Sequence, residues 1–331
     1  MTVTKNELVN LICKKVFILD GAMGTELQKR GMPLGVCPEE WCSEHPDVVI
    51  DIQRQYIEAG SDAVYTATLG GNSIKLSEYG LGNKTYEINK KLAEISKKAV
   101  GSKGFVGGDI STTGKYIEPF GNMSFETAVE VYKEQVKALL DGGVDFFIIE
   151  TMMDIQEARA ALLAVKESCD LPAFVTMTFN EDGRTLTGTD PVTALITLQN
   201  LGADAVGCNC STGPEAMVEI IRQMKPYSKV PLIAKPNAGL PKLVNNKTVF
   251  DMSPETFGSF VKPLIEAGVN IIGGCCGTSW EYIKQIKENV SGLTPLLPAS
   301  CQGSILSSAR KTVKIGPSKP ITIVGERINP T

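Results

Sequence analysis

Short apolar runs alternate with longer amphipathic runs along most of the chain. The short runs are rich in β-branched and aromatic residues and predict eight strands, at residues 16–19, 62–68, 105–110, 145–151, 173–179, 205–210, 231–237 and 270–276. The longer runs carry apolar residues at helical spacing, as at 46–60, 124–143, 154–169 and 253–268. Because eight strand–helix units over roughly 280 residues are the count of a (β/α)8 TIM barrel, we predict an α/β protein of that architecture.

Glycines mark several helix ends and help to separate the barrel from its main competitor. Gly60, Gly143 and Gly268 each close a predicted helix just before an apolar strand, which is typical of a left-handed glycine cap. A doubly wound sheet that binds a dinucleotide would need a Gly-x-Gly-x-x-Gly turn after its first strand. The first strand here is followed by Asp-Gly-Ala-Met-Gly-Thr, which lacks that spacing. The barrel is therefore favoured.

The bulk composition narrows the choice of partners. The 331 residues are 43% hydrophobic and carry a net charge of −4, with no basic run. Such a chain is a poor candidate for binding nucleic acid or an anionic membrane. No apolar stretch is long enough for a membrane span, and the N-terminal residues do not resemble a signal peptide. We expect a cytoplasmic protein.

In a TIM barrel the reactive groups lie where the strands end and the βα loops begin. The predicted strand ends bring polar and sulfur-containing side chains to one mouth: Asp20, Glu150, Asn209, Cys210, Lys235, Asn237, Cys275 and Cys276. Three cysteines from two different strands therefore converge. The single histidine, His45, precedes a predicted helix and is expected at the surface, so the chemistry depends on other side chains.

The cysteines favour a metal site. In a reducing compartment the nine cysteines are not expected to form a disulfide framework. Cys275 and Cys276 lie between glycines that permit an irregular backbone, so both sulfurs can join Cys210 in binding one zinc ion. Two alternatives remain open: small residues packed beside a tight turn, and a redox-active disulfide between the two neighbours.

Cys208 decides whether such a zinc site is open or closed. It lies two residues before Cys210, so on a regular strand it shares that side chain's face and points into the barrel one layer deeper. We expect it to fill the core. If it were instead a fourth ligand, the site would be saturated and structural, whereas three thiolates leave one position for substrate.

The remaining mouth residues suit an amino acid. Asp20 and Glu150 form an acid pair for an ammonium group, and the backbone amides of Gly21, Ala22 and Met23 form a nest for a carboxylate. The alternative for both acids is helix capping. Asn237 is the neutral oxygen best placed to fill a vacant zinc position, or else a simple turn residue.

Six motifs resemble one known family: DGAMGT, IIETMMD, TLTGTDP, GCNCSTGP, KPNAG and GGCCGT. Together they are similar to the homocysteine-binding domain of cobalamin-dependent methionine synthases, a domain shared with homocysteine methyltransferases that use betaine or S-methylmethionine. The resemblance covers about residues 8–290. It implies one zinc ion held by Cys210, Cys275 and Cys276, homocysteine sulfur as the exchangeable ligand, and Asp20 and Glu150 around the substrate amino group.

The resemblance also suggests how the chain is divided. Residues 1–290 would form the homocysteine-binding barrel, residues 291–320 a linker or arm, and residues 321–331, with the run VGERINP, resemble the start of a methyltetrahydrofolate-binding domain. One departure is the run Thr-Ala-Thr-Leu-Gly at 66–70, where cobalamin-dependent members usually have Thr-Asn-Thr-Phe-Gly. That departure leaves open a different thiol substrate or an altered partner surface.

The implied activity is zinc-dependent formation of a homocysteine thiolate, which takes a methyl group from methylcobalamin to give methionine. The chain has no Asp-x-His-x-x-Gly run of the kind that binds cobalamin, so methylcobalamin would arrive on another domain or chain. One alternative is a methyltransferase with a small donor such as betaine or S-methylmethionine. A second is a non-catalytic, zinc-stabilised thiol-binding module.

Overall fold

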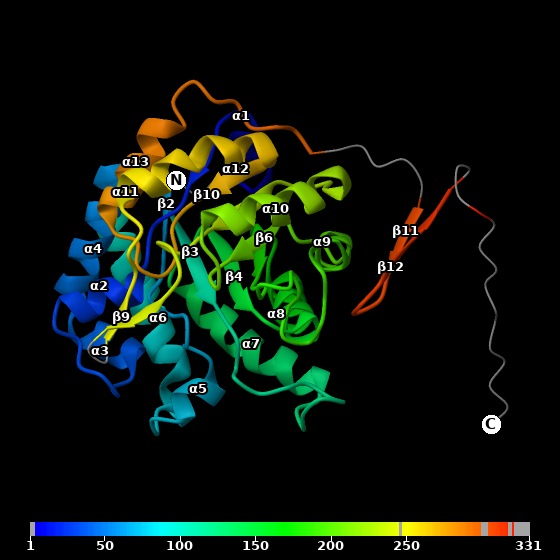
Figure 1. The fold of residues 1–331 in the computed structure, drawn as a ribbon. Coiled ribbons are helices and arrows are strands. Elements are labelled where there is room, and N and C mark those ends of the chain that lie inside the picture. Colours follow the sequence, from blue (N-terminus) through cyan, green and yellow to red (C-terminus); the bar gives the residue numbers. More distant parts are fainter. Residues whose placement is uncertain (1–3, 245–246, 299–303, 317–319, 321–331) are drawn as a thin grey trace, which may run out of the picture.

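The eight predicted strands form a single parallel sheet that curves into a barrel (Figure 1). The computed structural model describes residues 4–244, 247–298, 304–316 and 320. The strands neighbour each other in the order β1-β10-β7-β6-β5-β4-β3-β2. Their bounds are β1 Phe17–Ile18, β2 Ala63–Tyr65, β3 Phe105–Ile110, β4 Phe146–Met152, β5 Ala173–Met177, β6 Ala205–Asn209, β7 Leu232–Lys235 and β10 Val269–Ile272. The two edge strands meet where the Asp62 amide donates to the Ile18 carbonyl at 2.6 Å, so the (β/α)8 prediction is confirmed.

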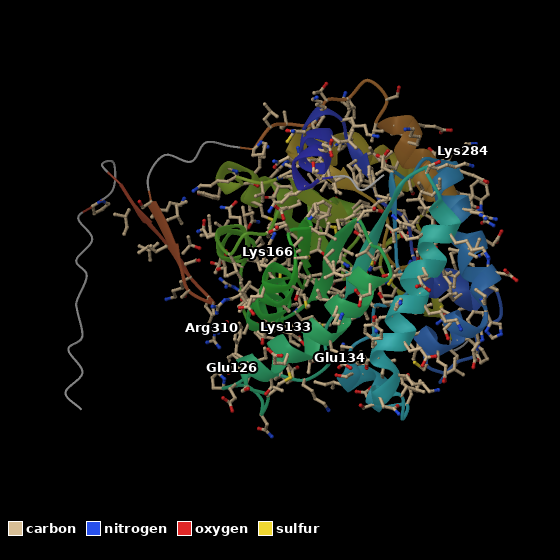
Figure 2. The ribbon with its side chains drawn as sticks, turned by 180° about the vertical axis from the view of Figure 1, so that it is seen from behind. Glu126, Lys133, Glu134, Lys166, Lys284 and Arg310 are labelled. Atoms are coloured by element: carbon tan, nitrogen blue, oxygen red, sulfur yellow. The ribbon has the colours of Figure 1, made fainter. Side chains whose placement is uncertain are left out.

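Helices surround the strands on the outside, and charged side chains such as Lys133, Glu134 and Lys166 lie on them (Figure 2). Most connect consecutive strands as the barrel requires. Their bounds are α1 Lys5–Lys14, α2 Met23–Lys29, α3 Pro38–Glu44, α4 Pro46–Ala59, α5 Ser73–Ser77, α6 Thr85–Val100, α7 Phe125–Asp141, α8 Ile155–Ser168, α9 Pro191–Asn200, α10 Pro214–Met224, α11 Pro254–Ser259, α12 Val261–Ala267 and α13 Trp280–Asn289. Of the described helices, none is long and apolar enough to cross a membrane.

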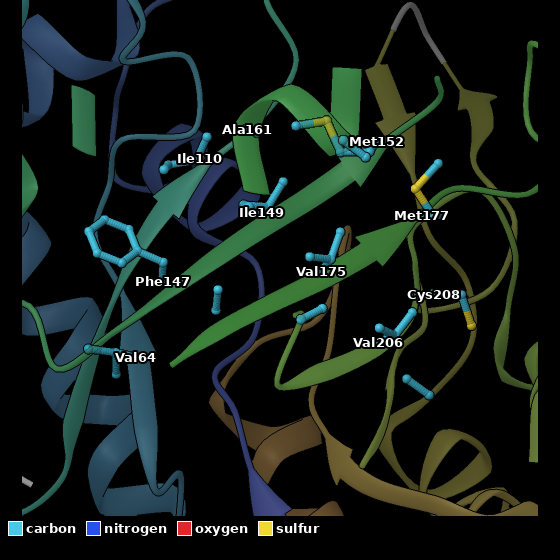
Figure 3. Close-up of a cluster of buried hydrophobic side chains, with 14 of the residues drawn as sticks. Val64, Ile110, Phe147, Ile149, Met152, Ala161, Val175, Met177, Val206 and Cys208 are labelled. Carbon is cyan, nitrogen blue, oxygen red and sulfur yellow. The ribbon is translucent and has the colours of Figure 1, made fainter. Parts of the chain in front are cut away.

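Alternate residues of each strand serve two separate cores. The inward-facing positions fill the barrel with a buried cluster that includes Phe17, Phe146, Phe174 and Ile233. The outward-facing positions join the helices in a larger cluster (Figure 3), with the side chains of Val175, Met177, Val206 and Cys208 among its members. Side-chain direction at the mouth therefore follows from strand register.

One difference from the sequence prediction has a simple cause. The helix expected at 253–268 is divided at Phe260 into α11 and α12. Pro263 has no amide hydrogen to bond the Ser259 carbonyl, and its ring crowds that carbonyl, so one continuous helix is disfavoured. The predicted glycine caps are confirmed, since φ is +116° at Gly60, +85° at Gly143 and +126° at Gly268.

Two hairpins were not predicted. One, β8 Lys242–Val244 with β9 Lys247–Val249, lies in the connection after β7. The other, β11 Ser304–Ser307 with β12 Thr312–Ile315, lies within the predicted arm and packs beside α9 (Figure 1). Its turn carries Arg310, whose guanidinium lies 5.2 Å from the ring of Phe120 on the barrel (Figure 2). The run at 321–331 that resembles a second domain lies outside the described residues.

Candidate metal and substrate site

Three cysteine sulfurs meet at the mouth of the barrel. The Sγ atoms of Cys210, Cys275 and Cys276 all lie within 4.8 Å of one another, and those of Cys210 and Cys276 are 3.9 Å apart. All three residues are partly exposed. The convergence of these cysteines, expected from the strand ends, is therefore present in the structure.

The backbone leaves regular strand geometry where these cysteines occur. Strand β6 ends at Asn209, and Cys210 and Ser211 follow with φ of +60° and +63°. Strand β10 ends at Ile272, earlier than predicted, so Cys275 and Cys276 lie in a loop rather than on a strand. That loop is fixed to the end of β7, because the Cys275 amide donates to the Pro236 carbonyl at 2.8 Å.

Glycines allow this loop to pass close to its neighbours. A Cβ on Gly273 would lie 2.8 Å from the backbone oxygen of Asp20, which cannot move aside cheaply. Gly277 has φ of +83°, in the left-handed region that favours glycine. The Gly-Gly-Cys-Cys-Gly run thus places two consecutive cysteines at one site.

The three sulfurs fit a zinc ion. Tetrahedral coordination with Zn–S bonds of about 2.3 Å separates neighbouring sulfurs by about 3.8 Å, close to the 3.9 Å between Cys210 and Cys276. The Oδ1 atom of Asn237, whose residue is 2% exposed, accepts no hydrogen bond. Hydrogen bonds from Cys275 and Cys276 lower the pKa of Cys210.

Cys208 lies apart from this set, and the direction predicted for it was wrong. Its side chain does not point into the barrel but packs between the strands and the helices, beside Val206 and Met177 (Figure 3). Burial raises the pKa of its thiol to about 12. The prediction assumed that Cys210 continues a regular strand, whereas the left-handed conformation at Cys210 turns that side chain back toward the mouth. The expectation that Cys208 fills a core is met.

Beside the cysteines lies a pocket built around a buried ammonium group. The Nζ atom of Lys235 lies 3.1 Å from Asp20 Oδ1, 3.8 Å from Glu150 Oε2 and 3.6 Å from the centre of the Tyr65 ring. The other oxygen of Asp20, Oδ2, accepts a hydrogen bond of 2.7 Å from the Tyr65 amide. Burial alone would lower the pKa of Lys235, but the charges of Asp20 and Glu150 raise it overall, which keeps the ammonium protonated.

Register explains why further polar side chains share this pocket. Asp109 pairs with the inward-facing Ile148, and Asn209 pairs with Lys235. Asn209 accepts a hydrogen bond from Thr176 and lies with its Nδ2 atom 3.8 Å from Cys275 Sγ. Lys235 and Asn209 were expected at the mouth without an assigned role, and Asp109 was not expected there. Asp109 is the charged residue in an otherwise apolar and glycine-containing strand, which was the available signal.

The predicted carboxylate nest is partly engaged by the protein itself. The amide of Ala22 donates to Thr278 Oγ1 at 3.2 Å, and the Ala22 carbonyl accepts from the Tyr56 hydroxyl at 2.7 Å. Gly21 is buried and Met23 begins α2. His45 is exposed between α3 and α4, as expected.

Comparison with known proteins gives a consistent assignment. The family model described as homocysteine S-methyltransferase matches residues 17–290. Methionine synthases from Mycobacterium tuberculosis and Mycobacterium leprae are 30% and 29% identical to this chain over 98% of its length. The chain spans only 28% and 29% of those two proteins.

Solved structures agree on the fold. The metallated homocysteine methyltransferase MmuM from Escherichia coli superposes with a TM-score of 0.71 at 22% identity, over 84% of this chain and 98% of MmuM. The oxidised form of the same protein gives a TM-score of 0.72 over 85% of this chain. Since the family model spans most of the residues, including those that build the cysteine cluster and the acid pocket, the chain belongs to the homocysteine S-methyltransferase family.

Proposed function

We propose that this chain binds homocysteine and activates its thiol for methyl transfer, giving methionine. The observation that carries the proposal is the position of three converging cysteine sulfurs directly beside a buried acid pocket. One end of the site suits a sulfur and the other suits an ammonium group, and homocysteine carries both. The spacing of the three sulfurs matches that of thiolates around one zinc ion, so we propose one zinc ion per chain, held by Cys210, Cys275 and Cys276.

Zinc bound by three thiolates would lower the pKa of a substrate thiol that joins them, so that the sulfur is held as a thiolate. A free thiol has a pKa of about 8.5 and is mostly protonated at neutral pH. Asn237, buried and with Oδ1 unpartnered, is the neutral group we assign to the zinc position that substrate takes. The chain can then activate the thiol without a histidine base.

The protein's own residues would orient the rest of the substrate. Glu150 would supply negative charge for the amino group. We assign the carboxylate to the nest of Gly21, Ala22 and Met23, in which the Ala22 amide already donates to Thr278 Oγ1. In the transfer step the substrate sulfur forms a bond to the methyl carbon. The bond from that carbon to its donor breaks, and its electron pair leaves with the donor.

We propose methylcobalamin, carried by another domain or chain, as that donor. The similarity to methionine synthases covers 98% of this chain and so continues past residue 290, where the family model ends. Large apolar side chains are also exposed on loops that follow four strands at the mouth: Leu69, Met153, Leu186 and Leu240. Apolar surface of this kind is typical of contact with another protein domain. A methyltetrahydrofolate-binding domain would supply methyl groups to that carrier.

One observation favours a second candidate, a small cationic donor. A cavity of about 860 Å³ adjoins the cysteine cluster at Thr212 and Gly239. Five acidic side chains line it, Glu181, Asp182, Glu215, Glu219 and Asp251, against one basic side chain, Lys242. A sulfonium or quaternary ammonium group, as in S-methylmethionine or betaine, would be attracted there.

Homocysteine binding is expected to release close to one proton per molecule at pH 7, because the thiol is protonated in solution and bound as a thiolate. Calorimetric titration of the zinc-loaded chain in buffers of different ionisation enthalpy measures this number. Homoserine, with a hydroxyl in place of the thiol, is the control and should bind weakly without proton release. Tight homocysteine binding with no net release would contradict thiolate activation.

A further inference from the structure

The carboxyl group of Asp109, in the acid pocket, has one oxygen that the protein leaves without a hydrogen-bond partner. Asp109 is 5% exposed, and its Oδ1 atom accepts no hydrogen bond. Asp20, in contrast, is fully engaged, since Lys235 binds one of its oxygens and the Tyr65 amide the other. Asp20, after β1, therefore has both carboxylate oxygens bound, whereas Asp109, on β3, has one oxygen available to a ligand.

The backbone around Asp109 is held firmly. Its amide donates to Thr66 Oγ1 at 2.9 Å, and its carbonyl accepts from Thr68 Oγ1 at 2.8 Å. Gln135 lies 3.4 Å from the same carbonyl. The side chain is thus presented at an inward-facing position on β3, one strand away from Glu150 on β4.

Two further polar atoms in this part of the pocket also lack partners. Glu150 Oε2 makes no hydrogen bond, although it lies 3.8 Å from the Lys235 ammonium. The Tyr65 hydroxyl makes none either, and its residue is 5% exposed. Buried polar groups normally have hydrogen-bond partners, and unpartnered ones require an explanation such as a ligand.

We infer that Asp109 and Glu150 together form the subsite for the amino group of the substrate, and that Asp20 is a positioning residue that holds Lys235. This inference rests on the proposed function, since it assumes an α-amino thiol as the substrate. The sequence led us to expect Asp20 and Glu150 as the acid pair. In the inferred pair, Asp109 and Glu150, each carboxyl group has one oxygen without a hydrogen-bond partner.

The charges of the pocket favour this arrangement. Lys235 carries one positive charge, which lies 3.1 Å from Asp20 and 3.8 Å from Glu150, against three carboxyl groups in the pocket. Burial and the charge of Glu150 raise the pKa of Asp109 well above its usual range. An incoming ammonium group is a donor with three hydrogens, enough to reach both open carboxyl groups and still bond a third acceptor.

The test compares homocysteine with γ-mercaptobutyrate, which has the same thiol and carboxylate but no amino group. Affinity of each for the zinc-loaded chain is measured by calorimetry in the wild type and in Asp109→Asn. We expect Asp109→Asn to weaken homocysteine binding by about 10- to 100-fold, the range for a charged hydrogen bond. Binding of γ-mercaptobutyrate should be unchanged, and zinc content should stay at the wild-type level.

Asp145→Asn is the matched control. Asp145 is also a buried carboxylate, but it binds Lys97 and the Val106 amide at the opposite end of the barrel. Asp145→Asn should change the free energy of unfolding without changing the affinity for homocysteine or for γ-mercaptobutyrate. If Asp109→Asn does not fold, Asp109→Ser gives the same comparison with a smaller side chain.

Three outcomes would overturn the inference. One is no loss of homocysteine affinity in Asp109→Asn, and another is an equal loss for both thiols. The third is equal affinity of the wild type for homocysteine and γ-mercaptobutyrate, which would mean that no amino group is recognised. Failure of the wild type to bind either thiol would instead refute the proposed function as well.

Discussion

Replacing Cys210 by alanine is expected to lower the zinc affinity of the chain by more than about 100-fold, beyond the range seen for changes outside the ligand shell. The substitution removes one of three anionic ligands from a site that has no other cysteine within reach among the described residues. Zinc content after dialysis against a graded series of chelators measures the loss. Cys275→Ala and Cys276→Ala should behave in the same way.

Cys208→Ala is the matched control for this experiment. It removes the same atom two residues earlier, from a side chain packed between strands and helices. It should keep one zinc per chain and cost on the order of 1 kcal/mol in the free energy of unfolding. Zinc loss from Cys208→Ala as severe as that from Cys210→Ala would show that four thiolates bind the metal and would refute an open site.

Methionine formation by the zinc-loaded chain is expected with homocysteine and free methylcobalamin, and not with methyltetrahydrofolate. The thiolate can attack a methyl group that reaches the open mouth, but the chain has no cobalamin-binding run to take a methyl group from folate. Turnover with methyltetrahydrofolate alone should equal that of a protein-free control. Chromatographic measurement of methionine distinguishes these results.

The Cys276→Ala variant is the control for uncatalysed transfer, because it keeps the barrel but lacks one sulfur of the cluster. S-methylmethionine and betaine serve as competing donors. Faster turnover with either of them than with methylcobalamin would favour the second candidate and assign the acidic cavity beside Thr212 to donor binding.

The barrel was predictable because its signals are local and repeated. Each apolar run of β-branched residues corresponds to a strand of the sheet, and each glycine cap considered adopts a positive φ. The cysteine cluster was predictable for a different reason. The C-terminal ends of all strands in a barrel lie at one mouth, so residues 66 positions apart in the chain, Cys210 and Cys276, can be placed together without a contact map.

Side-chain direction was the part that the sequence did not reveal. The inward position of Asp109 and the pairing of Asp20 with Lys235 depend on register between strands, which local patterns do not specify. The direction of Cys208 was predicted by counting back from Cys210, and the count fails because Cys210 has φ of +60°. The error at Cys208 arises where a strand passes into a loop.

The central claim is an open zinc site that binds homocysteine through its sulfur. X-ray absorption at the zinc edge tests it directly, because Zn–S bonds of about 2.3 Å are distinguishable from Zn–N and Zn–O bonds of roughly 2.0–2.2 Å. Without homocysteine we expect three sulfur ligands and one oxygen or nitrogen ligand. With saturating homocysteine we expect four sulfur ligands. Four sulfurs before homocysteine is added, or three sulfurs that remain three after it, would contradict the account.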